Sequence, residues 1–181
     1  MLSADHGFES ATYAVRACAT AGLTPYRSVV AGLAVVTGRR SNMGRSEAVT
    51  RLLREISAAA DPTQPIVQRL KDGVGIPGFG SNYYRAGDPR ARFLLQRYEA
   101  IFGDNDFRKL RKAVAAVKDL YDLEPDFVFA NAYGYLRLGL DARHSLFPLG
   151  RSAGWIAHSI EQFEAGEALR ATETYTGLLP S

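Results

Sequence analysis

Residues 46–58 read SEAVTRLLREISA, and this stretch repeats apolar side chains at the period of a helix. Positions i, i+3, i+4 and i+7 share one face of an α-helix, and an apolar stripe on that face indicates an amphipathic helix. Ser46 followed by Glu47 suits a helix start, so we predict that the helix begins there. The four positions of the stripe are Val49, Leu52, Leu53 and Ile56.

Helical patterns continue on both sides of this stretch. Asp88-Pro89 stands before one of them and Gly103 after it, residues typical of the two ends of a helix. No segment shows sustained alternation of apolar and polar residues, the pattern of a half-buried strand. We therefore predict an all-α fold. The further helical segments are residues 66–70, 91–102, 110–121, 127–140 (apolar nearly all round) and 156–163.

Composition sets broad limits on the class of protein. The chain has 181 residues, 46% of them hydrophobic and 23% charged, which indicates a globular core and excludes a disordered or collagen-like chain. The formal net charge of +3 is too small to indicate a nucleic-acid partner. The single cysteine, Cys18, cannot form an internal disulfide, and the longest apolar run, residues 29–36, is too short for a membrane span. These features predict a soluble, cytoplasmic protein without a membrane partner.

Few residues are spaced for metal binding or for nucleophilic catalysis. The three histidines, His6, His144 and His158, do not have metal-ligand spacing with one another or with Cys18, so no metal site is predicted. Residues 73–81 contain four glycines, which allow positive φ angles or a close approach of the backbone to a ligand. The segment lacks the Gly-Lys-Ser/Thr ending of a P-loop. From these residues alone, it is either an ordinary connector or a ligand-binding loop.

Five short motifs follow one another along almost the whole chain. They are Ala4-Asp5-His6 with Ser10-Ala11-Thr12, Gly78-Phe79-Gly80, Asp88-Pro89-Arg90, Gly150-Arg151 continuing to His158 and Glu161-Gln162, and Leu169-Arg170 ahead of Tyr175-Thr176-Gly177. In this order and at this spacing, the motifs resemble those of the citrate synthase family. Together they are far more specific than any one of them alone.

The resemblance implies a helical protein with a large and a small domain, normally a homodimer with its active site in the cleft. Family members are about twice as long, and this chain resembles their C-terminal half. Residues 1–46 and 142–181 would then belong to the large domain, and residues 47–141 to the small domain. We accordingly expect either a homodimer or a complex with a chain that supplies the N-terminal half.

The resemblance also assigns binding residues. Guanidinium groups suit a dicarboxylate because their planar forks grip carboxylates bidentately and stay charged at any physiological pH. The positions that match the oxaloacetate-binding residues of the family are His6, Arg90, Arg151 and Arg170. The positions that match the coenzyme A loop are Ile76, Pro77, Gly78 and Phe79, and Arg85 matches a contact to the coenzyme A phosphates. No permanently bound cofactor is expected, and acetyl-CoA or coenzyme A would be a ligand or co-substrate.

All three catalytic positions of the family are substituted here. Asn42 and Ser81 stand where the family has histidines, and Val128 stands where it has the aspartate that removes a proton from the acetyl group. Losing a general base costs roughly 10²- to 10⁴-fold in rate. Asp126 is the nearest carboxylate, but two residues along a helix lie on opposite faces, so a rescue requires either a shifted register or a non-helical start.

Two functions follow from this pattern, with a third possibility beside them. The leading hypothesis is a degenerate homologue that binds a dicarboxylate or 2-oxo acid and an acyl-CoA without efficient Claisen condensation. The alternative is an active acyltransferase that condenses acetyl-CoA, or another acyl-CoA, with oxaloacetate or a related 2-oxo acid, alone or with a partner chain. The third is a foldable remnant of a longer gene.

Overall fold

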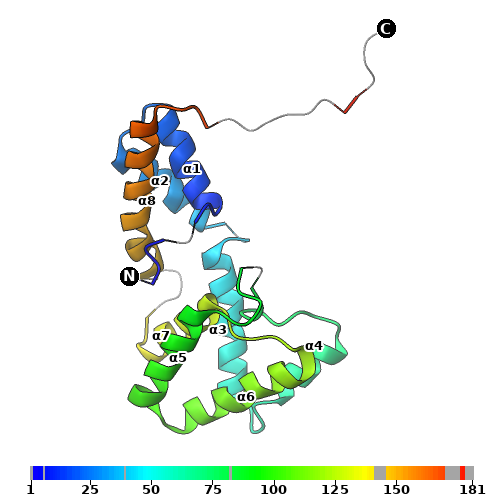
Figure 1. Cartoon of the computed structure of the whole chain (residues 1–181). Coiled ribbons are helices and arrows are strands. Elements are labelled where there is room, and N and C mark those ends of the chain that lie inside the picture. The colour runs from blue at the N-terminus through cyan, green and yellow to red at the C-terminus, as the bar shows by residue number, and fades with distance from the viewer. Residues whose placement is uncertain are drawn as a thin grey trace. The chain divides into compact units, whose positions relative to one another are not determined.

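The fold was obtained as a computed structural model that describes residues 2–5, 7–38, 40–81, 83–140, 146–169 and 176–177. Within these ranges the chain is helical, and its only extended pairing is an isolated antiparallel bridge between Phe79 and Pro125 (Figure 1). The all-α prediction is confirmed. The helices are α1 (Ser10–Thr20), α2 (Pro25–Val36), α3 (Asn42–Ala58), α4 (Gln64–Lys71), α5 (Pro89–Phe102), α6 (Asn105–Tyr121), α7 (Phe127–Arg137) and α8 (Leu146–Ala165).

The chain divides into two compact units. Unit 1 comprises residues 3–35 and 149–181, and unit 2 comprises residues 36–148. Unit 1 contains α1, α2 and nearly all of α8, and unit 2 contains α3 to α7. The assignment of these segments to a large and a small domain stays a prediction. No helix in the described ranges is both long enough and apolar enough to span a membrane.

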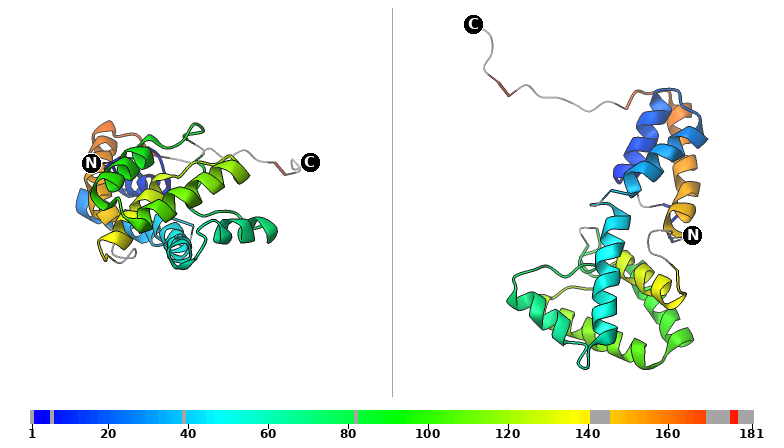
Figure 2. Two further views of the ribbon diagram at one scale, coloured as in Figure 1. Left: turned by 90° about the horizontal axis from the view of Figure 1, so that it is seen from below. Right: turned by 180° about the vertical axis from the view of Figure 1, so that it is seen from behind.

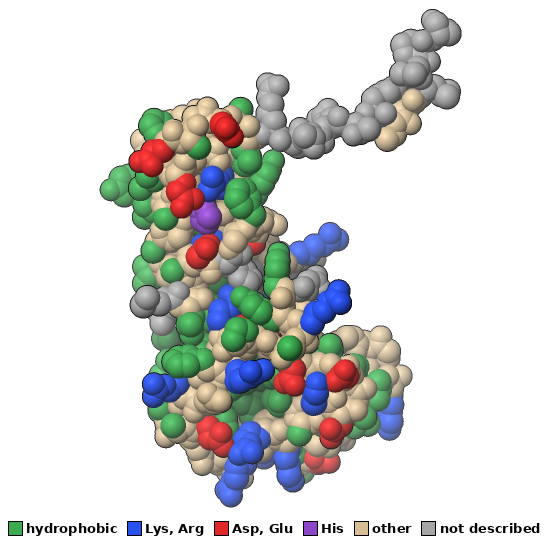
Figure 3. All heavy atoms as spheres, viewed as in Figure 1, with side chains coloured by type: hydrophobic (Ala, Val, Ile, Leu, Met, Phe, Trp, Pro, Cys, Tyr) green, Lys and Arg blue, Asp and Glu red, His purple; other side chains and the backbone are tan. Residues whose placement is uncertain are grey.

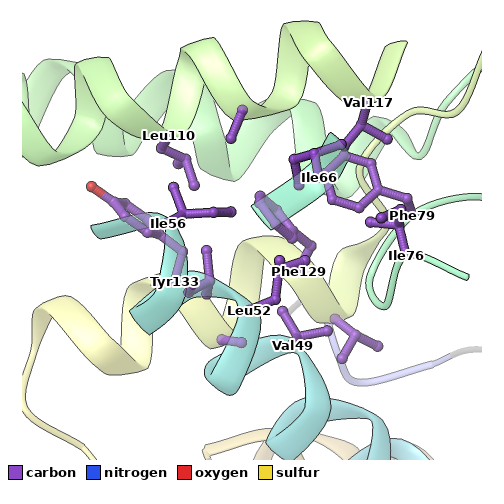
Figure 4. Packing of buried hydrophobic residues seen from close by; sticks show 14 of the residues in the cluster. Val49, Leu52, Ile56, Ile66, Ile76, Phe79, Leu110, Val117, Phe129 and Tyr133 are labelled. Atoms are coloured by element: carbon purple, nitrogen blue, oxygen red, sulfur yellow. The ribbon is translucent and has the colours of Figure 1, made fainter. Parts of the chain in front are cut away.

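Unit 2 is built around α3, which packs against α4, α6 and α7, while α5 packs on the other side of α7. In Figure 2, α3 is the cyan helix that runs across the green helices of this unit. The predicted stripe on α3 forms part of the core, where Val49 and Leu52 are 0% exposed and Leu53 is 3% exposed. Figure 4 shows this stripe facing Phe129 of α7 and Ile66 of α4. Burying each large aliphatic side chain stabilises the fold by about 1.5–3 kcal/mol.

The start of α3 differs from the prediction. The helix begins at Asn42, and Ser46 lies buried within it instead of capping it. Ser41 precedes the helix in extended conformation and donates its hydroxyl hydrogen to the carbonyl oxygen of Val36, 2.7 Å away. The first turn adds no apolar residue to the stripe, so the apolar pattern could not reveal it.

α7 is buried on most sides, as its sequence predicts. Eight of its eleven residues are buried. It ends at Arg137, earlier than predicted, because Gly139 adopts a φ of +68° and the N–H of Leu140 returns to the carbonyl of Tyr135. A left-handed glycine of this kind is a common end to a helix.

Unit 1 packs α1, α2 and α8 around Trp155, which is 0% exposed. Gly32 permits the close approach of α2, because a Cβ atom there would lie 2.9 Å from Trp155 and from Val15. The opposite side of α2 presents apolar side chains at i, i+4 and i+7 to solvent. They are Tyr26, Val30 and Leu33, exposed by 81%, 63% and 39%.

Candidate functional site

The glycine-rich loop of unit 2 is fixed against the start of α7. The N–H of Asp126 donates to the carbonyl of Gly78 at 2.8 Å, and the N–H of Gly80 donates to the carbonyl of Glu124 at 2.9 Å. The rings of Phe79 and Phe129 pack with centroids 4.7 Å apart. The loop therefore has one defined backbone path next to the N-terminus of α7.

Gly78 is required at its position for two reasons. Its φ is +84°, a conformation that L side chains rarely adopt, and a Cβ atom would come within 2.8 Å of Val49 and 3.0 Å of Phe129. Of the other predicted coenzyme A residues, Ile76 and Phe79 are buried, Pro77 is half-buried and Arg85 is exposed. Ile76 and Phe79 pack into the core, and this packing accounts for the shape of the loop. Arg85 places a positive charge at the surface.

Arg90 is held by Asp88, the N-cap of α5. The Nε and Nη2 atoms of Arg90 donate to the two carboxylate oxygens of Asp88 at 3.0 and 2.7 Å, and its backbone N–H donates at 2.9 Å. The guanidinium also lies 4.6 Å from the ring centroid of Phe127 and 5.4 Å from that of Tyr84. Burial opposes ionisation of Asp88, but the hydrogen bonds from Arg90 outweigh it and hold the pKa of Asp88 below its ordinary value.

Asp126 is the N-cap of α7 and the second buried carboxylate of unit 2. Its backbone is extended, with φ −93° and ψ 175°, and its side chain accepts from the N–H of Phe129 at 3.0 Å and from the guanidinium of Arg45. Burial raises the pKa of Asp126 above its ordinary value and Asp88 adds to the rise, against the opposing effects of Phe129 and Arg45. Asp126 therefore lies outside α7, in the non-helical segment just before it, as a role for Asp126 as a general base would require.

Of the three residues predicted to stand at the family's catalytic positions, Val128 and Ser81 have described side chains, and neither is placed as an acid or a base. Val128 is 8% exposed and belongs to the hydrophobic core. The Ser81 hydroxyl accepts hydrogen bonds from the backbone N–H groups of Tyr83 and Tyr84 at 3.2 and 3.3 Å, so it closes a turn. Asn42 is the first residue of α3, and its side chain lies outside what the structure describes.

Arg151 lies in unit 1 and is fully buried. Its Nη1 donates to the carbonyl of Ala4 at 2.5 Å and its Nη2 contacts Thr12. Its Nε is buried and has no hydrogen-bond partner among the described residues. Burial lowers the pKa of Arg151, although the carboxylates of Glu9 and Asp5 act in the opposite direction. A guanidinium so enclosed ties the N-terminal segment to α8.

Two glycines of α8 make room for that segment. A Cβ atom at Gly154 would overlap the carbonyl oxygen of Ala4, and one at Gly150 would overlap the hydroxyl of Ser3. The glycines of the motif around Arg151 therefore allow the N-terminal segment to pack closely against α8.

His158 belongs to a polar network on the same unit. Its Nε2 lies 3.1 Å from Asp5 Oδ1 and its Nδ1 lies 3.0 Å from Arg16, which also pairs with Glu161 at 3.0 Å and bonds Gln162 at 2.9 Å. Both ring nitrogens of His158 therefore have a polar partner. The network holds Asp5, the neighbour of His6, against α8.

The predicted binding residues are divided between the units. Arg90 and the loop at 76–79 lie in unit 2, and Arg151 lies in unit 1, whereas His6 and Arg170 are outside the described residues, as is His144. Within the described ranges, no cluster of three His, Cys, Asp or Glu side chains could hold a metal ion.

Two side-chain contacts at the candidate site of unit 2 were not predicted from the sequence. Arg45 reaches Asp126 across 81 positions, and no local pattern signals such a pair. Asp88 was predicted as a helix start and as part of the Asp88-Pro89-Arg90 motif, but its role in holding the Arg90 guanidinium was not predicted.

Helical units, an Asp-Pro-Arg helix start and a glycine loop against α7 together define a citrate synthase fold. The sequence pattern of the family described as "Citrate synthase, C-terminal domain" matches residues 1–172, and this chain belongs to that family.

Individual relatives give the same picture. The chain is 29% identical to the citrate synthase of Haloferax volcanii over 98% of its own length and 48% of that protein. It superimposes on citrate synthase from Thermotoga maritima with a TM-score of 0.82 and 28% identity, covering 99% of this chain and 51% of that one. A ternary complex of Thermoplasma acidophilum citrate synthase with carboxymethyl coenzyme A and oxaloacetate matches in fold, with a TM-score of 0.81 at 23% identity, covering 99% of this chain and 51% of that one. This chain therefore spans about half the length of these relatives.

Proposed function

We propose that this chain binds an oxaloacetate-like 2-oxo dicarboxylate and an acyl-CoA, and that it does not catalyse efficient Claisen condensation. The observation that carries the second part is Val128. A valine embedded in the core can neither accept nor donate a proton, and it stands where the family has its general base. Ser81 adds to this reading, because its oxygen already accepts two backbone hydrogen bonds.

The binding part of the proposal is supported by Arg90. Asp88 holds its guanidinium in one orientation, and two aromatic rings flank it, so little side-chain entropy would be lost when a carboxylate binds. A relative with the same fold was crystallised with oxaloacetate and a coenzyme A analogue. Of the functions that the family resemblance implies, binding of a carboxylate by Arg90 is the one that this structure supports best.

A partner is part of the proposal, since the relatives are about twice as long. We expect a homodimer, or a complex with a chain that supplies the N-terminal half of the fold. The apolar face of α2, formed by Tyr26, Val30 and Leu33, supports a partner surface in unit 1.

Binding and turnover should be measured separately on the full chain. Titration calorimetry with oxaloacetate is expected to show saturable binding that Arg90→Ala abolishes and Arg97→Ala preserves, because Arg97 lies on the same helix over the ring of Phe93. Release of coenzyme A from acetyl-CoA in the presence of oxaloacetate is expected to stay below about 10⁻⁴ of an ordinary enzyme rate. The absence of oxaloacetate binding would refute the proposal, and so would turnover above that floor.

A second candidate function rests on Asp126. Asp126 precedes α7, so it is not held on the helix face opposite Val128. Burial raises the pKa of Asp126, and the ionised carboxylate is therefore a stronger base than that of an ordinary aspartate. If the chain is an active acyltransferase, Asp126 is the residue we expect to remove the proton.

Two substitutions separate the two functions. Asp126→Asn keeps a helix-capping side chain and should abolish any coenzyme A release that depends on Asp126. Val128→Asp tests the hypothesis that the chain binds its ligands but lacks a general base. If only the base is missing, this substitution should raise the rate of coenzyme A release. Circular dichroism of both variants checks that the helices are retained.

A further inference from the structure

A groove between α5 and α6 in unit 2 has no role in the site described above. Its volume is about 450 Å³, within the range of small-molecule sites. In Figure 3, hydrophobic side chains line the space between these helices, and Lys, Arg, Asp and Glu side chains surround it. The floor is formed by Leu95, Phe107, Leu110 and Val114.

The rim of the groove carries three cations, and two of them are already paired. Arg111 lies 2.6 Å from Glu99, and Lys118 lies 2.7 Å from Asp122 and 3.4 Å from Glu124. Arg92 differs from both. Its Nη2 donates to the carbonyl of Ala86 at 3.2 Å, and no carboxylate of the described residues lies within ion-pair distance of it.

Arg92 is placed at the end of the groove that lies beside Gly87. A Cβ atom at Gly87 would be 3.3 Å from Nη2 of Arg92, so the guanidinium is close to the wall formed by Gly87 and Asp88. Asp88 lines the same end of the groove, but its two carboxylate oxygens accept hydrogen bonds from Arg90 and not from Arg92. Glu124 also lies beside Gly87, with its Cβ and Cγ 3.3 Å from the same Cβ position, but it forms no ion pair with Arg92. The groove therefore combines an apolar floor with a guanidinium at one end that no carboxylate of the described residues pairs with.

We propose that this groove binds an amphipathic monocarboxylate, with the carboxylate on Arg92 and an unbranched apolar chain along the floor. A guanidinium fork matches a planar carboxylate, and the chain buries apolar surface that water now covers. Glu99 and Glu124 on the rim disfavour a second negative charge, so a dicarboxylate fits less well. The site uses none of the residues assigned to oxaloacetate or coenzyme A, so it does not depend on the proposed function.

Decanoate is the probe, and titration calorimetry on the full chain is the measurement. We expect one saturable site with a Kd on the order of 0.1 mM. Arg92→Ala should weaken decanoate about tenfold, the effect of one charge-assisted hydrogen bond, and should leave the affinity for decanol unchanged. Arg97→Ala is the matched control on the same helix and should bind decanoate as the native chain does.

A second variant tests the floor independently of the charge. Ala115 is exposed and lines the groove, so Ala115→Trp should fill it and abolish binding of both decanoate and decanol. Unchanged circular dichroism shows that these variants fold. The proposal is overturned if native protein does not bind decanoate saturably, or if the folded Arg92→Ala and Ala115→Trp variants bind it as the native chain does.

Discussion

Asp88 and Asp126 are the same residue at the same position of a helix, yet their pKa values shift in opposite directions. Each is the N-cap of a helix, and they are 4% and 5% exposed. The pKa of Asp88 is lowered and that of Asp126 is raised. Low exposure and a capping role alone therefore do not set the direction in which the pKa of a carboxylate shifts.

Two causes separate them: desolvation is the largest influence on Asp126 and raises its pKa, and the two carboxylates meet different arginines. The side chain of Arg90 is 15% exposed and engages both oxygens of Asp88, whereas the side chain of Arg45 is 51% exposed and pairs with one oxygen of Asp126. A water-exposed cation compensates a buried charge poorly, because solvent screens it. Asp126 also bears the repulsion of Asp88, and its ionisation is disfavoured accordingly.

The largest expected effect is on the stability of Arg90→Ala. Removing this arginine leaves Asp88 buried without its partner, which should lower the free energy of unfolding by about 3 kcal/mol. Arg45→Ala, which removes a half-exposed arginine, should cost about 1 kcal/mol or less. Urea unfolding followed by circular dichroism measures both. Equal losses would contradict the distinction drawn between the two pairs.

Asp88→Asn should have the next largest effect, and that effect should depend on pH. Because the folded pKa lies below the unfolded value of about 3.8, ionised Asp88 stabilises the fold above that value. This stability is lost as the pH falls through the folded pKa. We expect a loss of about 2 kcal/mol at pH 7 that shrinks below about pH 3.8. Unfolding measured across that range checks it, and a pH-independent loss would contradict the assignment.

Asp126→Asn should have the smallest effect and the opposite dependence. Because the folded pKa is raised, the contribution of Asp126 is full below the unfolded value near 3.8 and is lost as the pH rises through the folded pKa. Asparagine keeps the cap without a buried charge, so we expect a change within about 1 kcal/mol at pH 7. Comparison with the native chain at pH 7 and at acid pH measures this difference, and a large loss at pH 7 would show that ionised Asp126 is well compensated.

The sequence by itself predicted the family and helices that overlap α3 to α8, but it did not predict α1 and α2. The stripe on residues 46–58 predicted the buried face of α3, and Asp88-Pro89 predicted the start of α5. Both signals can be found from sequence because they depend on residues only a few positions apart along the chain. The ordered motifs identified the citrate synthase family, and the match of Val128 to a catalytic position stays a prediction from that resemblance.

Only the tertiary structure decided the electrostatics of these residues. Arg45 is 81 positions from Asp126, and Arg151 is more than 140 positions from Ala4 and Gly7, whose carbonyls it contacts. The groove between α5 and α6 likewise depends on how two helices pack. The energy of a charge depends on burial and on neighbours brought together by folding, and no local pattern encodes either.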